Sequence, residues 1–313
     1  MVISANRLAG TFLVLAMGFA GLPGFAGDGK PSPSPPDEGE PSETDPFPDT
    51  ASFPPYGIHQ IGFDAKYLVT RPAHWDRKGW GKVAMIAGAT LGLYLLRDEI
   101  REEVLEHRSP GRTDFLDDVR TMGKGAIAPS LALIAYISSF ATKKDREKET
   151  ALLLMESMAY SAVGAFTGSF ILATERPDEG DTIAFFQAGG HGVSLDTALA
   201  FSVIPPLRRQ YLMTRPEDGK GKKFWKRTAS GFLYLGAGLT GYQRMYADKH
   251  WAPDVFLGAV TGLVVGNTLS DAHAATKGQS QGRHQVTFNP GGVVWTIRLG
   301  SHKNRGAVTE SGD

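Results

Sequence analysis

Long stretches without charged residues recur along the chain and predict buried helices. They are rich in Ala, Gly, Leu and Met, and they lack the period-two alternation of half-buried strands. Their positions are residues 83–96, 125–142, 157–174, 197–207, 228–243 and 255–270. A charged stretch at residues 98–107 predicts a further polar helix, ended by the helix-breaking sequence Ser109-Pro110-Gly111. The pattern therefore predicts an all-α fold organised as a six-helix bundle.

The C-terminal part of the chain has a different pattern, which predicts a short β-hairpin. Residues 285–288 and 293–299 alternate between polar and apolar positions around Asn289-Pro290-Gly291-Gly292. Asparagine, proline and glycine are typical of hairpin turns, so we place the hairpin at residues 284–299. Residues 301–313 are expected to form a flexible tail.

The first 55 residues differ from the rest. Residues 1–26 combine Arg7, an apolar run at residues 8–22 and small residues up to Ala26, which predicts an export signal peptide rather than an uncleaved anchor. In residues 27–55 nine prolines alternate with Ser, Glu and Asp, a composition typical of a disordered acidic linker. The folded domain is therefore expected at residues 56–300, in an exported protein that is periplasmic or associated with the envelope.

Composition and charge exclude several functions. The chain has no cysteine, which excludes disulfides, thiolate metal sites and cysteine nucleophiles. The formal net charge is zero, and the acidic linker leaves the remaining body only slightly basic. No nucleic acid is expected as a partner, because nucleic-acid binding normally uses a strongly basic surface. An anionic substrate or an anionic membrane surface fits the charge, and the sequence implies no metal and no cofactor.

The uncharged stretches are short for membrane spans. They contain 11 to 18 residues, whereas a span needs about 20, and the mean hydropathy of the chain is -0.18. We therefore favour a membrane-associated or water-soluble bundle and keep an integral membrane protein as the alternative.

The clearest candidate chemistry lies in residues 244–254. His250 follows Arg244 by six positions and precedes Asp254 by four, just before a predicted helix. A carboxylate at this spacing can accept the imidazole N–H, so that the other ring nitrogen faces an electrophile. Arg244 offers a planar guanidinium that suits phosphate oxygens. The spacing indicates a histidine nucleophile, a carboxylate that orients it and an oxyanion-binding arginine.

These residues resemble the third motif of the type 2 phosphatidic acid phosphatase (PAP2) superfamily, whose relatives include vanadium haloperoxidases. Gln243 replaces the serine of that motif. The first motif, Lys, six residues, Arg-Pro, is met by Arg176 and Pro177, with Ser169 in place of the lysine. The resemblance covers residues 101–267 and implies the family's helical bundle, with Arg176 as a second phosphate-binding residue.

The second motif of the family, Pro-Ser-Gly-His, fits two registers. One is Ala188-Gly189-Gly190-His191, which keeps the glycine and the histidine. The other is Val193-Ser194-Leu195-Asp196, which keeps the serine and precedes a helix-like sequence. We favour the second because the helix start positions the motif. It makes Ser194 a phosphate contact, puts Asp196 in place of the histidine, and replaces a glycine that favours close approach of phosphate by Leu195.

The resemblance implies hydrolysis of a phosphate monoester, with a lipid phosphate among the candidate substrates. In the family's mechanism His250 would attack phosphorus and form a phosphohistidine, while a second group protonates the leaving alkoxide. His191 can donate this proton if its loop reaches the site. Aspartic acids are normally ionised near neutral pH, so Asp196 in this role predicts activity at low pH only.

A second hypothesis belongs to a different class. The replacements at Ser169, Leu195 and Asp196 are also those of a catalytically degenerate PAP2-fold envelope protein with a binding or structural role. A haloperoxidase is a third hypothesis, weakened because vanadate binding would need the missing lysine and histidine. At single positions, Asp196 and Ser194 can simply cap a helix.

The basic stretch at residues 208–227 has two interpretations. It holds eight basic groups, with Tyr211, Phe224 and Trp225 among them. Such a segment can rest on an anionic bilayer, or it can be a solvated connection between helices.

Overall fold

The structure is a computed structural model that describes residues 58–123, 130, 132–134, 136–138, 145–279, 284–289 and 292–297. The predicted signal peptide, acidic linker and C-terminal tail lie outside these residues, as does most of the stretch at 125–142. Those assignments stay predictions.

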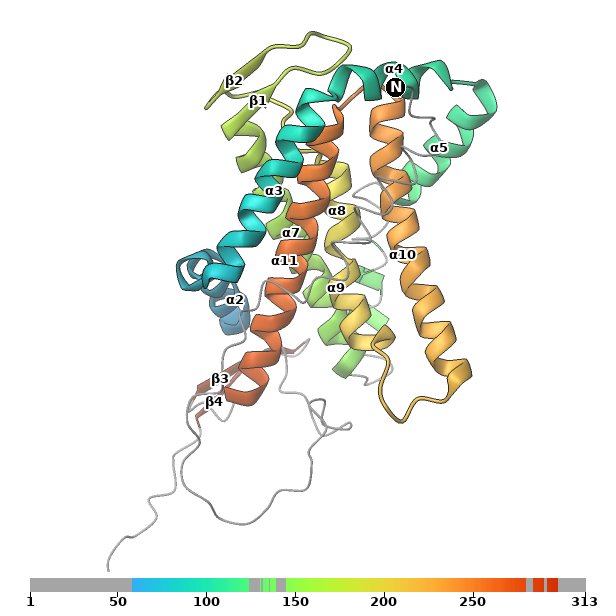
Figure 1. Cartoon of the computed structure of the whole chain (residues 1–313). Coiled ribbons are helices and arrows are strands. Elements are labelled where there is room, and N and C mark those ends of the chain that lie inside the picture. Colours follow the sequence, from blue (N-terminus) through green and yellow to red (C-terminus); the bar gives the residue numbers. More distant parts are fainter. Residues whose placement is uncertain are drawn as a thin grey trace, which may run out of the picture.

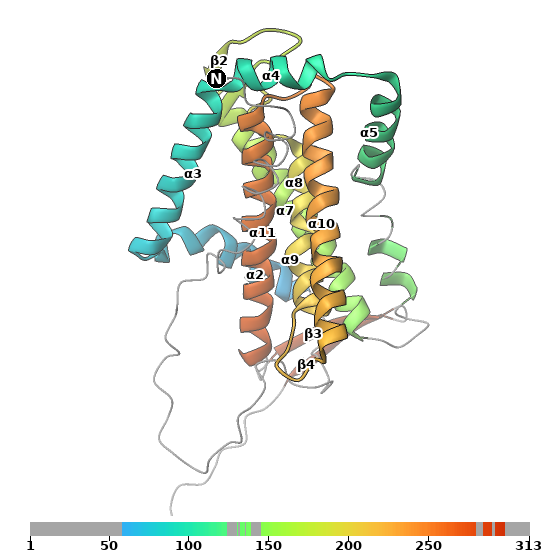
Figure 2. The ribbon, with the colours of Figure 1, turned by 45° about the vertical axis from the view of Figure 1, so that its right-hand side comes forward.

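One long helix, α11 (Ala252–Gln279), runs through the centre of the bundle and contacts most of the others (Figure 1). Around it lie α3 (Arg77–Leu95), α7 (Asp145–Ile171), α8 (Leu195–Ser202) and α10 (Lys220–Tyr246). Figure 2 shows α10 and α11 side by side, joined at one end by a short turn. The fold is all-α, as the sequence predicted.

Shorter elements complete the bundle. They are α2 (Ile58–Thr70), a 3-10 turn at Arg71–His74, α4 (Arg97–Glu106), α5 (Pro110–Gly123), α9 (Ile204–Leu207) and a π-helical turn at Arg208–Leu212. The polar helix expected at residues 98–107 is α4, which lies across one end of the bundle (Figure 1). Five of the six uncharged stretches coincide with helices in the described part of the chain.

Helix ends were predicted less well than helix positions. α7 begins at Asp145 and α10 at Lys220, both well before their uncharged stretches. The added turns contain Lys, Arg and Glu, which are good helix formers although they give no apolar signal. For the same reason the largely polar α5 was not predicted. The stretch at 197–207 divides into α8 and α9, the second of which has proline in its first turn.

Two small antiparallel sheets are present among the described residues. The C-terminal hairpin is confirmed as β3 (His284–Asn289) and β4 (Gly292–Ile297), with Val286 opposite Trp295. The other sheet, β1 (Leu172–Thr174) with β2 (Ile183–Phe185), was not predicted. Three residues are too few to show an alternating pattern, so β1 is not distinguishable in sequence from the helix that precedes it.

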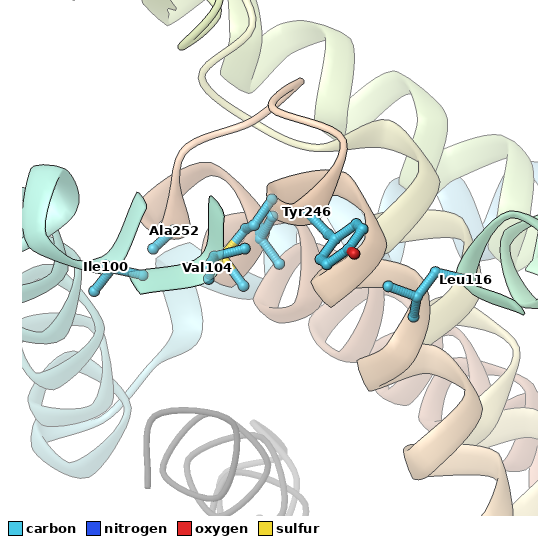
Figure 3. Close-up of a cluster of buried hydrophobic side chains, with 7 residues drawn as sticks. Ile100, Val104, Leu116, Tyr246 and Ala252 are labelled. Carbon is cyan, nitrogen blue, oxygen red and sulfur yellow. The ribbon is translucent and has the colours of Figure 1, made fainter. Parts of the chain in front are cut away.

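A buried hydrophobic cluster supports the turn between α10 and α11. It joins α4, α5, the end of α10 and the start of α11 (Figure 3), and consists of Ile100, Val104, Leu116, Met245, Tyr246, Ala252 and Val255. The Tyr246 hydroxyl accepts a hydrogen bond from the Ser109 backbone N–H at 2.7 Å. Apolar burial and this hydrogen bond together fix α4 and α5 against the base of the turn.

Glycines let α8 approach α11 until the two backbones touch. Gly258, Gly262 and Gly266 are four residues apart and therefore share one face of α11. A Cβ atom at Gly262 would lie 2.2 Å from the Ala198 carbonyl oxygen, and one at Gly258 would lie 2.5 Å from that of Ser194. Real Cβ atoms do not come so close to backbone, so only glycine fits here.

This packing predicts that Gly262→Ala destabilises the protein. The added methyl group must push α8 away from α11, which should lower the free energy of unfolding by about 1–3 kcal/mol. The matched control is Gly236→Ala in α10, where a Cβ would meet nothing within 4 Å. The control should be neutral or stabilising by up to about 1 kcal/mol, because alanine favours helix over glycine. Chemical denaturation measures both, and a Gly262→Ala protein as stable as the control would contradict the packing argument.

Candidate functional site

The residues singled out in the sequence come together at the end of the bundle where α4 and the β1–β2 sheet lie (Figure 1). Arg176 follows β1, and Asp196 lies in the first turn of α8. Arg244 lies in the last turn of α10, and His250 in the turn that leads to α11. Four separate segments thus contribute to one site.

The turn that carries His250 is held from two sides. Asp248 adopts a left-handed conformation with φ of 59°, which reverses the chain after α10. Its carboxylate accepts two hydrogen bonds from Arg101 of α4, each 2.7 Å long. Lys249 forms an ion pair with Asp178 in the loop between β1 and β2. Both contacts restrict the orientation of the neighbouring histidine.

A backbone carbonyl fixes the tautomer of His250. Its Nδ1 atom lies 3.1 Å from the carbonyl oxygen of His191 and 3.7 Å from Oδ2 of Asp254. A carbonyl oxygen only accepts hydrogen bonds, so Nδ1 carries the proton and Nε2 keeps its lone pair. The sequence suggested Asp254 as the orienting group, but the nearer partner is the carbonyl of His191. Asp254 lies behind it as the more distant negative group.

Asp254 connects the elements around the site. It is 2% exposed, and its carboxylate accepts hydrogen bonds from the Trp251 N–H at 3.0 Å and from the Thr174 hydroxyl at 3.5 Å. Its own backbone carbonyl accepts a hydrogen bond from the Ser194 N–H at 3.0 Å. Burial raises the pKa of Asp254, and the nearby His250 and the hydrogen bond from the Trp251 N–H oppose this shift. The residue ties β1 and the start of α8 to the start of α11.

His191 lies beside His250. The centres of the two rings are 6.2 Å apart and the rings are nearly perpendicular. Burial lowers the pKa of His191, and the positive charge of Arg176 lowers it further. The flanking glycines are needed, because a Cβ at Gly192 would lie 1.9 Å from the Leu172 carbonyl oxygen. The first sequence register therefore places its histidine next to the candidate nucleophile.

Asp196 lies between two arginines. Its Oδ2 atom is 3.2 Å from Nε of Arg120 and 3.3 Å from Nε of Arg244. Two ion pairs therefore engage the same carboxylate oxygen. Arg120 lies in α5, 76 positions from Asp196 in the chain, and the sequence analysis did not identify it. Nothing in the local pattern around Arg120 distinguishes it from other surface arginines.

Three guanidinium groups make this end of the bundle suitable for an anion. The side chain of Arg244 is 11% exposed, and burial lowers its pKa, an effect that Asp196 opposes and that Arg120 and Arg176 increase. Among the described residues, the buried Nε atom of Arg176 makes no hydrogen bond, and the buried Nε atom of Arg244 has the ion-pair contact with Asp196 at 3.3 Å. Buried donors normally have a partner, so the Nε atom of Arg176 is available to an oxyanion.

The remaining motif positions have structural contacts. Ser194 is fully buried at the start of α8, and its hydroxyl accepts a hydrogen bond from Thr197 at 2.9 Å, so its contact with phosphate stays a prediction. Ser169, which replaces the family's lysine, hydrogen-bonds both the N–H and the carbonyl of Val193 at 3.1 Å. Gln243 donates to Asp117 at 2.7 Å. None of these three side chains adds positive charge to the site.

Comparison with known proteins gave two similar solved structures. No family model matches the chain, and no curated protein matches it. The crystal structure of LpxE from Aquifex aeolicus is 22% identical over 56% of this chain and 95% of its own, with a TM-score of 0.42. A transmembrane PAP2 type phosphatidylglycerolphosphate phosphatase from Bacillus subtilis is 16% identical over 68% of this chain and 94% of its own, also with a TM-score of 0.42.

The two contacts of Asp248 predict that Arg101 restricts the turn at residues 247–251. Arg101→Lys and Arg101→Met both lose the paired hydrogen bonds, because only a guanidinium spans both carboxylate oxygens. Amide hydrogen exchange in this turn should become about tenfold faster in either variant. The control is Arg112→Met, which removes an exposed hydrogen bond to the His107 carbonyl. Equal exchange in the wild type and the Arg101 variants would show that the ion pair does not hold the turn.

Proposed function

We propose that this chain is a PAP2-like phosphatase that hydrolyses a phosphate monoester through a phosphohistidine intermediate. The observation that carries the proposal is that Arg176 and Arg244 lie at one site with His250, whose Nδ1 is hydrogen-bonded to a backbone carbonyl. This arrangement offers positive groups for phosphate oxygens and a free lone pair on Nε2 of His250.

The reaction assigns a role to each group. Arg176 and Arg244 bind the phosphate oxygens and stabilise the charge that develops on them. Nε2 of His250 attacks phosphorus as the bond to the alkoxide breaks, and His191 donates a proton to that alkoxide. Water then attacks phosphorus as the bond to Nε2 of His250 breaks, and His191 removes a proton from this water, so that phosphate leaves and His250 is regenerated. We assign the acid to His191 rather than to Asp196, because the ring of His191 lies beside that of His250, whereas the carboxylate of Asp196 is engaged by Arg120 and Arg244.

Aromatic residues beside the site support a lipid phosphate as the substrate. Phe185 and Phe186 are 63% and 68% exposed at the end of β2. The ring of Phe170 packs edge-on against that of Phe186, with the two ring centres 6.2 Å apart. Phe186 has a φ of 57°, which is rare for a bulky residue. Apolar groups kept in solvent next to a phosphate site can contact the acyl chains of an amphiphilic substrate.

Other exposed apolar surfaces support an association with a membrane. Large apolar side chains are also exposed on α3, α7 and α10, including Trp80, Leu91, Phe166, Phe224 and Trp225. Within the described residues, one helix segment, Ala252–His273, is long and apolar enough to span a bilayer, and 67% of its most apolar window is buried in the bundle. The bent pair α3–α4 would add a second candidate. We propose an exported envelope protein held at the membrane surface, with integral insertion as the alternative.

Part of the positive charge in the basic segment at 208–227 is paired with nearby carboxylates. α10 begins inside it, at Lys220. Asp218 pairs with Lys222 at 2.8 Å and with Lys226 at 2.6 Å, and Arg209 pairs with Asp271. Contact of this segment with an anionic bilayer stays a proposal, supported by the exposed Phe224 and Trp225.

A second candidate function is an anion-binding envelope protein without catalysis. The contact of Asp196 with Arg244 favours it, because a carboxylate near the bound phosphate would weaken the charge stabilisation that catalysis needs. The two candidates differ in whether His250 is required for any reaction.

Phosphate release by the full-length chain tests the proposed reaction. On a soluble monoester and on phosphatidic acid in mixed micelles, His250→Ala should lower the rate at least about a thousandfold, because the nucleophile is removed. His107→Ala, which alters an exposed histidine just after α4, is the matched control and should keep the wild-type rate. Acid-labile phosphate should be trapped on the wild type only. Release that survives in His250→Ala would exclude this mechanism, and no release by any protein would favour the binding function.

The pH profile should report His191. A general acid must be protonated, and the pKa of His191 lies below its ordinary value of 6.5 because of burial and neighbouring positive charge. The rate should therefore be highest in acid and should fall as pH rises through a pKa below 6.5. His191→Ala should abolish this fall and should slow alkyl phosphates more than nitrophenyl phosphate, whose leaving group needs no proton. A fall in rate that persists in His191→Ala and disappears in Asp196→Asn would instead identify Asp196 as the acid.

A further inference from the structure

One carboxylate oxygen serves two arginines at the candidate site. Oδ2 of Asp196 contacts Nε of Arg120 at 3.2 Å and Nε of Arg244 at 3.3 Å. The side chains of Arg120 and Asp196 are 28% and 21% exposed, whereas that of Arg244 is 11% exposed. The carboxylate therefore connects the more buried, inner arginine, Arg244, to the more exposed, outer arginine, Arg120.

This contact offsets the electrostatic cost of burying Arg244. A buried guanidinium is costly without a negative partner, and Arg244 has two further arginines in its electrostatic surroundings. Asp196 forms an ion pair with Arg244, and Asp117 adds a second negative charge to its electrostatic surroundings. The negative charge of Asp196 opposes a bound phosphate, because both anions would share one guanidinium.

We propose that Asp196 is an internal counterion that an incoming phosphate displaces from Arg244, while Arg120 retains the carboxylate. This inference rests on the proposed function, since it assumes that the arginines bind phosphate. It gives Arg120 a positioning role: the outer arginine holds Asp196 away from the bound anion. The affinity of the site is then set by the exchange of one anion for another.

A purely structural role for Asp196 makes a different prediction. Asp196 lies in the first turn of α8, where a negative charge favours the helix. In that case its neutralisation would reduce stability and leave phosphate affinity unchanged. Affinity and stability therefore separate the two roles.

The test measures binding of inorganic phosphate to the full-length chain by calorimetry. Asp196→Asn should bind about tenfold tighter or more, because a like charge beside the ligand is removed. Asp181→Asn is the matched control: it removes one negative charge from an 80% exposed side chain at the same end of the molecule and should change affinity less than twofold. Asp196→Ser, which also suits a helix start, replaces Asp196→Asn if that variant does not fold.

Arg120 is tested in two backgrounds. Arg120→Gln should weaken phosphate binding about tenfold in the wild type, because Asp196 then stays on Arg244. The same change should have little effect in Asp196→Asn, where no carboxylate needs to be held. Equal weakening in both backgrounds would show that Arg120 binds phosphate directly and would overturn its positioning role.

The outcomes also separate this inference from the proposed function. If the wild type binds phosphate and neutral variants at position 196 bind no tighter, the counterion role is wrong and the phosphate site stands. If neither the wild type nor the folded variants bind phosphate, the anion site is wrong, and the counterion role and the proposed function fail together.

Discussion

The close contact between α8 and α11 is the constraint on which the rest of the structure depends. Gly258 and Gly262 let the α8 backbone rest on the central helix, and the Ser194 N–H donates to the Asp254 carbonyl where both helices begin. This fixes the first turn of α8 beside the first turn of α11. Asp196 is then held near Arg244, and Asp254 is held behind His250. The chemistry at this end of the bundle is thus a consequence of backbone packing.

Burial gives the site its electrostatic character. Arg244 loses solvation among other positive groups, so it requires an anion, which Asp196 supplies in the free protein. His250 is held by a neutral carbonyl, with the buried Asp254 farther away. Its orientation therefore does not depend on a full ion pair, and the Nε2 atom stays on the side of the ring away from this contact. The positive charge of the site and the reactivity of the histidine are controlled by different contacts.

Sequence patterns identified the helices and the residues of the third motif, because both depend on local spacing. The α4 helix, the C-terminal hairpin and the turn with His250 all follow from neighbouring residues. Arg120 could not be predicted in this way, because its contact with Asp196 joins distant parts of the chain. The contact also depends on α5, a polar helix without the apolar pattern that predicts a helix. The carbonyl of His191 could not be predicted either, because every residue carries one. The two competing registers of the second motif prove compatible in space: His191 lies beside His250, and Asp196 lies beside Arg244.

The glycine face of α11 packs against one side of α8 and leaves the side chain at position 196 outside this contact. Ser194 and Thr197 are buried against the central helix, whereas the side chain of Asp196 points out of this contact and is partly exposed. A change of residue at 196 therefore alters charge without repacking the core. In evolutionary terms, a protein with this scaffold can gain or lose an acid, a base or a counterion at that position through single substitutions. The second motif can then diverge with little loss of stability, because the helices that carry it keep their packing.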